Sequence, residues 1–247
     1  MSSRCNRADS LPLDRSRPAA VAPAIDLHLH TTRMSPDSSL RPEELADAAG
    51  LTRLWAVCVT EHDGMWDGQE MARFRDGAPI VVLHGMEVST DLGHVGVFGL
   101  DRYVGGIHRL NELRRIADAE DAILIANHPF RYRLDPRFSR GGVTFDPERP
   151  EVAIGYELFA MVDAIEVANG ACSAQENRFA LAVARLLGLA EVGGSDSHSA
   201  GSVGCAATLF EGPVRTEREL IDAIKGHRCR AASRAGSDGT LLAVSLD

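Results

Sequence analysis

The 247-residue sequence is long enough for one α/β barrel-sized domain or for two small domains, and 45% of its residues are hydrophobic, which suffices for a substantial core. Its formal net charge of −9 argues against a protein that coats duplex nucleic acid, because such proteins carry a basic stripe. The five cysteines are scattered without a C-x-x-C pair, which favours a reducing, cytoplasmic location. Since no apolar run approaches the roughly 20 residues that span a bilayer, we expect no membrane association.

Short apolar runs and helical patterns alternate along the chain after a polar start. Residues 1–23 are rich in Arg, Pro, Ser and Ala without a continuous apolar stretch, so we expect a disordered leader rather than a secretory signal. Hydrophobic patterns and turn residues then predict strands over 24–29, 54–60, 79–88, 94–100, 122–127, 163–169, 190–196 and 204–210. Helices are expected over 41–50, 67–77, 107–120, 173–188 and 216–227.

Continuous apolar strands separated by helices are typical of a mostly parallel sheet covered by helices. With about seven such strands, a closed or distorted (β/α) barrel is the predicted fold, and an open doubly wound sheet is the alternative. No linker interrupts residues 24–247, which we interpret as a single domain. Residues 129–160 form a long Arg-, Pro- and Gly-rich insert, and loops of this length are usually functional lids or disordered.

Nearly all residues able to bind metal lie at the carboxyl ends of these strands, the face on which barrel enzymes build their sites, whereas His94 begins a strand. The residues are His28, His30, His62, Glu87, His94, His128, Asp196 and His198. Because side chains alternate along a strand, His28 and His30 point the same way, as do Asp196 and His198 if that segment is extended. Imidazole with carboxylate suits Zn²⁺, Mn²⁺ or Fe²⁺ better than Ca²⁺ or Mg²⁺. Glu87 can bridge two ions about 3.5–4 Å apart, as carboxylates do in two-metal phosphatases.

The motifs "DLHLHT…SPDSSLRPEEL", "VTEHD", "GMEVST…GHVGVFGL", "NHPF" and "GGSDSH" together resemble the ordered motifs of the PHP (polymerase and histidinol phosphatase) family, in particular its stand-alone metal-dependent phosphoesterases. The resemblance implies a distorted seven-stranded (β/α) barrel that carries two or three divalent ions (Mn, Zn or Fe). It implies one ion on His28, His30, Glu87 and Asp196, a second on Glu87, His94 and His128, and a third on Asp37, His62 and His198.

For the reaction we expect a metal-bound hydroxide to attack phosphorus, without a protein nucleophile. Asp26 and Asp63 flank predicted ligands and are candidates for accepting hydrogen bonds from ligand imidazoles, although capping or solvent-exposed roles explain them as well. Arg131 follows the "HPF" sequence and is the candidate phosphate clamp, because a guanidinium matches phosphate in a fork.

The predicted activity is hydrolysis of a small phosphorylated metabolite or nucleotide. One alternative is a 5′-3′ exonuclease or oligonucleotide-trimming phosphodiesterase. The others are a metal-dependent amide or lactone hydrolase and a non-catalytic metal-binding module. The sequence leaves the exact substrate and the oligomeric state open.

Overall fold

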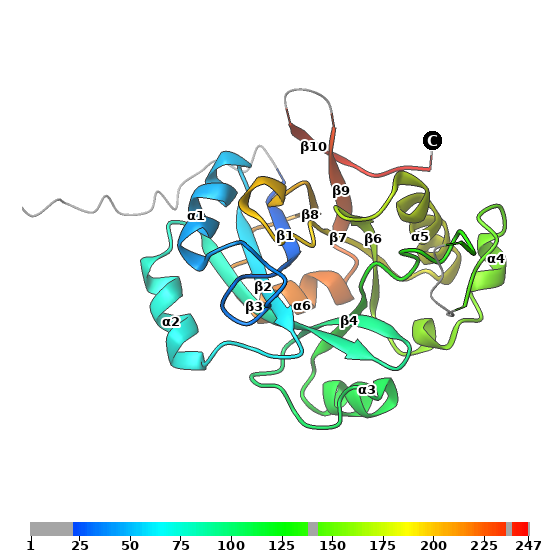
Figure 1. Cartoon of the computed structure of the whole chain (residues 1–247), viewed down its shortest axis with the longest axis horizontal. Helices are drawn as coiled ribbons and strands as arrows, with labels where there is room; N and C mark the ends of the chain where they lie inside the picture. Colours follow the sequence, from blue (N-terminus) through cyan, green and yellow to red (C-terminus); the bar gives the residue numbers. More distant parts are fainter. Residues whose placement is uncertain (1–21, 138–142, 236–238, 247) are drawn as a thin grey trace, which may run out of the picture.

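The computed structural model describes residues 22–137, 143–235 and 239–246, and nearly all of the predicted leader lies outside these ranges. Ten strands of the described chain form one curled, half-barrel sheet of mixed direction (Figure 1). In chain order the strands are β1 (Ala24–Leu29), β2 (Ala56–His62), β3 (Val81–Thr90), β4 (Gly93–Phe98), β5 (Ile123–Ala126), β6 (Ala164–Asn169), β7 (Ala190–Gly194), β8 (Ala206–Phe210), β9 (Cys229–Ala235) and β10 (Thr240–Ala243).

The helical elements connect these strands and lie around the sheet. They are α1 (Pro42–Leu51), α2 (Gly68–Gly77), α3 (Leu110–Ala119), α4 (Pro150–Ala153), η1 (Glu157–Ala160), α5 (Ala174–Leu187), η2 (Ala200–Ser202) and α6 (Glu217–Lys225). Helices α1 and α2 lie beside β1–β3, and α5 packs against β6 (Figure 1). Within the described residues none of these helices has the length and apolarity needed to cross a membrane.

The sheet order is β10-β9-β8-β1-β2-β3-β4-β5-β6-β7, so the predicted mostly parallel barrel of seven strands needs correction. Helices α1 and α2 make the crossovers that keep β1, β2 and β3 parallel. Only two residues separate Thr90 from Gly93, too few for a crossover, and β4 therefore runs antiparallel to both β3 and β5. Strands β8, β9 and β10 add three antiparallel neighbours beyond β1.

The two ends of the β1–β7 segment meet where both strands end. Leu29 forms a parallel bridge with Ser197, just beyond β7. The amide of His30 donates to the carbonyl of Ser197 at 2.9 Å, and the amide of Asp196 donates to the carbonyl of His28 at 2.7 Å. The curl of the sheet thus brings the segments after β1 and after β7 together.

The insert at residues 129–160 is packed against the protein in its described part. The ring centroid of Phe145 lies 5.3 Å from that of Phe130 and 6.3 Å from that of Phe179. Tyr156 stacks edge-on against Phe145 and donates a hydrogen bond to the carbonyl of Leu92. This aromatic cluster fixes the segment against α5 and the β3–β4 hairpin.

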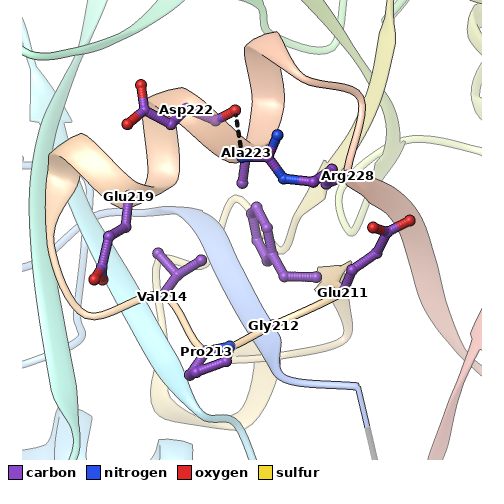
Figure 2. A pocket seen from close by; sticks show the side chains of 9 residues that line it. Glu211, Gly212, Pro213, Val214, Glu219, Asp222, Ala223 and Arg228 are labelled. Carbon is purple, nitrogen blue, oxygen red and sulfur yellow. Dashed lines mark hydrogen bonds between the residues drawn. The ribbon is translucent and has the colours of Figure 1, made fainter.

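A cavity of about 430 Å³ lies at the far end of β1 from the histidines (Figure 2). It is bounded by α6 and by the 211–214 loop, and the amide of Phe210 at its edge donates to the carbonyl of Pro23, immediately before β1. Its lining includes the carboxylates of Glu211, Glu219 and Asp222. This cavity is therefore remote from the ends of the strands where the metal-capable residues gather.

Candidate metal centre

All nine residues predicted as metal ligands lie close together at one edge of the sheet, where β1, β2, β3, β5 and β7 end and the antiparallel β4 begins. His28 belongs to β1 and His30 follows it, with Leu29 between them pointing into the apolar core on the other face. His62 ends β2 and is paired in register with Glu87 of β3. The remaining ligands come from β4, from the segments after β5 and β7, and from the loop after β1; they are His94, His128, Asp196, His198 and Asp37.

Glu87 is the centre of this group. Its Oε1 atom lies 3.2 Å from His28 Nε2, 3.1 Å from His128 Nε2 and 3.3 Å from His94 Nδ1. Its Oε2 atom lies 3.0 Å from His62 Nδ1 and 3.6 Å from His30 Nε2. The Glu87 side chain is 1% exposed, so a fully buried carboxylate faces five imidazoles, which is the arrangement expected of a bridging ligand.

Asp196 follows β7, the last strand in the sheet order, and lies near three of these five imidazoles. Its Oδ1 atom is 3.5 Å from His28 Nε2 and 3.3 Å from His30 Nε2, and its Oδ2 atom is 3.7 Å from His128 Nε2. Asp196 has a φ of 54°, a left-handed conformation that few non-glycine residues adopt. This turn, which is held by the hydrogen bond to the His28 carbonyl, directs the carboxylate toward β1.

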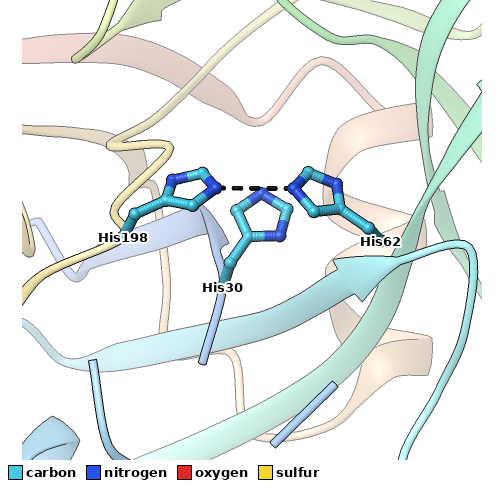
Figure 3. A group of neighbouring side chains, drawn as sticks. All are labelled: His30, His62 and His198. Atoms are coloured by element: carbon cyan, nitrogen blue, oxygen red, sulfur yellow. Dashed lines mark hydrogen bonds between the residues drawn. The ribbon is translucent and has the colours of Figure 1, made fainter. Parts of the chain in front are cut away.

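An outer group is more open to solvent. Asp37 Oδ2 lies 3.3 Å from His62 Nε2 and 3.4 Å from His198 Nε2. Figure 3 shows the rings of His62 and His198 facing each other with His30 between them, and their Nε2 atoms are 3.4 Å apart. The Asp37 side chain is 59% exposed and that of His198 is 31% exposed, so a ligand can enter the centre from this side.

The donor atoms fit divalent ions. His28 Nε2, His30 Nε2, His94 Nδ1 and Glu87 Oε2 are buried, and none of them forms a hydrogen bond with the described residues. Buried polar atoms without partners are costly unless something else coordinates them. Four groups of three ligands, among them His28–His30–Glu87 and Glu87–His94–His128, have donor atoms within 4.8 Å of one another. A mixture of imidazole and carboxylate donors at such distances suits transition-metal ions.

The imidazoles of the cluster differ in protonation. Burial opposes protonation of His28, but Asp196, Glu87 and Glu166 raise the pKa of His28 well above its usual value, so a metal ion would displace a proton from this ring. Burial lowers the pKa of His30 to about 4, so its imidazole is neutral and able to coordinate. Burial opposes ionisation of Glu87, but His28, His128 and His62 hold the pKa of this carboxyl well below its usual value. At neutral pH the centre therefore presents a neutral imidazole beside an ionised carboxylate.

Two buried glutamates contact the predicted ligands or their neighbours, and the sequence analysis missed both. Glu166 of β6 accepts from, or pairs with, His28 Nδ1 at 3.0 Å through Oε1, and its Oε2 accepts from the His128 amide at 2.8 Å. Glu61 accepts a 2.6 Å hydrogen bond from Ser35, whose hydroxyl lies 3.4 Å from His30 Nδ1. A charged residue inside each apolar strand, in "AIEVAN" and "VCVTEH", is the signal that could have identified them.

Asp26 and Asp63 have other roles than the predicted contact with imidazoles. Asp26 accepts hydrogen bonds from the amides of His28 (3.2 Å), Ser195 (2.8 Å) and Gly204 (2.9 Å). Burial raises the pKa of Asp26 to about 6, and these amide hydrogen bonds oppose the rise. Asp63 accepts from the amide of Ser89 at 2.8 Å and is exposed. Both carboxylates act on the backbone that carries the ligands, which sequence alone does not distinguish from a contact with the ring.

We expect Asp26→Asn to lower the free energy of unfolding by about 2–4 kcal/mol, because three buried amides lose a charged acceptor and face the new NH₂ group. Urea unfolding followed by circular dichroism measures the change. The exposed Asp47→Asn serves as the matched control and should leave the midpoint unchanged. An equal midpoint for the two variants would show that Asp26 does not support the fold in this way.

Arg131 lies at the edge of the centre. Its Nη2 atom donates to Asn169 Oδ1 at 2.7 Å and to Asp196 Oδ2, whereas its buried Nε atom has no hydrogen-bond partner among the described residues. Its neighbour Arg133 instead donates to the hydroxyl of Tyr156 at 3.0 Å. The structure thus gives Arg131 and Arg133 different partners and places Arg131 beside a predicted metal ligand.

A curled α/β sheet with buried histidines and carboxylates at its strand ends is the arrangement on which metal-dependent hydrolases build their sites. The PHP domain model matches residues 26–139, and the model of the PHP-associated region matches residues 174–229. By these two matches the chain belongs to the PHP family. No curated protein sequence gives a significant match.

Three solved structures illustrate the similarity. PsfC from Pseudomonas syringae PB-5123 is 23% identical with a TM-score of 0.57, and the match covers 83% of this chain and 90% of PsfC. A two-domain protein from Bacteroides vulgatus ATCC 8482, described as containing a predicted PHP-like metal-dependent phosphoesterase, is 18% identical with a TM-score of 0.58 and coverages of 94% and 69%. An amidohydrolase from Chromobacterium violaceum with bound sulfate and no metal is 17% identical with a TM-score of 0.56 and coverages of 87% and 99%. At these identities the likeness establishes the fold.

Proposed function

We propose that this protein is a metal-dependent phosphoesterase that hydrolyses a small phosphorylated metabolite or nucleotide. The observation that carries the proposal is the position of Arg131, a guanidinium bonded to Asp196 at the edge of the metal-capable cluster. A guanidinium in this position matches the geometry and charge of a phosphate group. The similarity to a protein described as a predicted metal-dependent phosphoesterase agrees with this proposal.

Two or three divalent ions would be held by His28, His30, Glu87 and Asp196, by Glu87, His94 and His128, and by Asp37, His62 and His198. Bound ions supply the Lewis acidity that activates water and neutralises phosphate oxygens. Glu87 and Asp196 keep the imidazoles clustered, and Glu166 fixes the ring orientation of His28. Arg131 would hold a phosphate oxygen in the orientation for attack.

Neither Cys172 nor Cys58 offers a nucleophile. Burial raises the pKa of Cys172 to about 12 and that of Cys58 well above its usual value, so both thiols are protonated at neutral pH. Ser197 also lacks a basic partner, because its hydroxyl donates to the Ser199 carbonyl and lies 2.6 Å from the Ser202 hydroxyl. Attack by water is therefore the favoured route.

A phosphate-release screen tests the proposal. Protein loaded with Mn²⁺, Zn²⁺ or Fe²⁺ is offered sugar phosphates, nucleoside mono- and bisphosphates, short oligonucleotides, and a set of amides and lactones. Release of phosphate from a small ester, absent in a Glu87→Gln variant purified in parallel, is the expected result. Cleavage of oligonucleotides alone would make the protein a nuclease. Turnover of amides or lactones alone, or binding of metal without any turnover, would overturn the phosphoesterase proposal.

Replacement of Arg131 by alanine should raise KM for the phosphate ester by about tenfold or more, because a charged hydrogen bond to the substrate is lost. Arg133→Ala, two residues along the chain and bonded to Tyr156, is the matched control. Steady-state kinetics of the two variants with the same metal decide the point. Unchanged kinetics in Arg131→Ala would remove this residue from substrate binding.

A further inference from the structure

A second cavity, of about 450 Å³, lies between β6, the first turns of α5 and the C-terminal segment. Its accessible apolar lining comes from Ala174 and Val244, and the nearly buried Val167, Leu181 and Ala206 lie behind them. The thiols of Cys172 and Cys205 also line it. Its volume is within the range of small-molecule sites, which are mostly apolar with a few polar groups.

The charge of this cavity is unlike that of the protein as a whole. Arg178 is its only charged lining residue, and no aspartate or glutamate contributes to it. Across the ranges that the structure describes, Arg178 has no hydrogen bond or ion pair. Other arginines close to it are paired: Arg131 binds Asp196, and Arg185 binds Glu191 at 2.9 Å. An unpaired guanidinium over an apolar cavity, in a chain of net charge −9, complements an anion.

The other polar atoms of the cavity are already engaged or uncharged. Both side-chain polar atoms of Asn177 bond to the backbone of Asn169, at 3.1 Å and 3.0 Å. Asn169 in turn donates to Glu166 and accepts from Arg131. Burial raises the pKa of Cys172 to about 12 and that of Cys205 to about 11, so both thiols are neutral. Arg178 is therefore the group left to recognise a charged ligand.

The cavity is separate from the metal centre. The layer formed by Asn169, Arg131 and Asp196 lies between them, because Asn169 lines the cavity and is bonded through Arg131 to Asp196. The cavity of Figure 2 differs from this one in its charge. Its Arg228 already donates to the backbone carbonyl of Asp222 at 2.9 Å, and three carboxylates line the cavity. An anion is disfavoured there.

We infer that the cavity between β6, α5 and the C-terminal segment binds a small organic anion, with its carboxylate or phosphate at Arg178 and its apolar body along Ala174 and Val244. This site does not depend on the proposed phosphoesterase activity. Its ligand is bound without being hydrolysed, because the metal-capable residues lie on the other side of the Asn169 layer.

Titration calorimetry of the full chain with octanoate, below its micelle concentration, tests the inference, and octanol serves as the uncharged probe. Saturable binding of octanoate is expected. Arg178→Ala should weaken it by about tenfold or more, because a charge-assisted hydrogen bond is lost. Since Arg178 and Ala174 are exposed, Arg178→Ala and the cavity-filling Ala174→Trp are expected to fold. Ala174→Trp should also weaken binding, whereas Arg228→Ala, in the other cavity, should not.

Three outcomes would overturn the inference. The first is absence of saturable octanoate binding, and the second is equal affinity in the wild type, Arg178→Ala and Ala174→Trp. The third is loss of binding in Glu87→Gln with full binding in Arg178→Ala, which would assign the carboxylate to the metal centre. Octanol that binds as tightly as octanoate would contradict the role of Arg178. Because all readouts measure binding, failure of the phosphate-release screen does not affect them.

Discussion

Glu87→Gln should reduce kcat/KM by at least about 10³-fold, equivalent to ~4 kcal/mol in the barrier. The substitution keeps the size of the side chain but removes the negative charge that faces five imidazoles, and its NH₂ group cannot coordinate an ion. Metal content should fall at the same time. Steady-state kinetics and elemental analysis of protein purified with excess Mn²⁺ measure the two effects.

Glu43→Gln is the control for this variant, because Glu43 is an exposed residue of α1. It should retain wild-type metal content and activity. A Glu87→Gln protein with full metal content and near-normal turnover would show that Glu87 does not bridge ions. Both proteins are also treated with chelator and then given metal again. Activity should return in the wild type and not in Glu87→Gln. Its return in the wild type shows that loss of ions by itself leaves the fold intact.

Glu166→Gln should weaken metal affinity by about 10–100-fold, the usual effect of removing the acceptor behind a ligand histidine. Glu166 is 2% exposed and its Oε1 atom faces His28 Nδ1, whereas a glutamine supplies an amide oxygen or a competing NH₂ donor there. Competition with a fluorescent chelator measures the affinity. The exposed Glu157→Gln is the matched control.

The effect of Glu166→Gln should be one of affinity. At saturating metal, kcat should recover to a larger fraction of the wild-type value than in Glu87→Gln, because every predicted ligand is still present. If saturating metal restores nothing, Glu166 takes part in the reaction itself. Unchanged affinity would mean that the contact with His28 has no influence on coordination.

The sequence was sufficient to predict which residues gather at the centre. Parallel strands place their carboxyl ends at one edge, so residues that follow β1, β2, β3 and β7 had to meet. Period-two alternation put His28 and His30 on one side of β1, with Leu29 in the core. These inferences require the strands and their alternation, which can be read locally. The direction of β4 could not, because β4 runs antiparallel and brings His94 to the centre from its amino end.

The partners behind the ligands could not be read in this way. His28 and Glu166 are separated by 138 positions, and their contact depends on how β6 is turned relative to β1. Alternation indicates that a side chain faces inward without saying what it meets. Asp26 illustrates the same limit, because its acceptor role requires the amides of Ser195 and Gly204, which reach it through the curl of the sheet.

The edge of the sheet was also missed for a physical reason. Strand β9, with the sequence CRAASRA, has none of the β-branched or aromatic residues that mark a strand, and β10 is mostly exposed. β9 is extended because β8 offers it a full ladder of backbone partners. Pairing overrides local preference there, as tertiary context often does.

Two backbone hydrogen bonds join the segment of His28 and His30 to the segment of Asp196 and Ser197, and both segments carry predicted ligands. An ion held by His28, His30 and Asp196 would link these two segments, because His28 and His30 belong to one and Asp196 to the other. Metal binding and the pairing of these two segments would then be coupled. An ion that binds only when the segments are paired stabilises the paired form. The residues that bind the metal would thus also hold the segments after β1 and after β7 together.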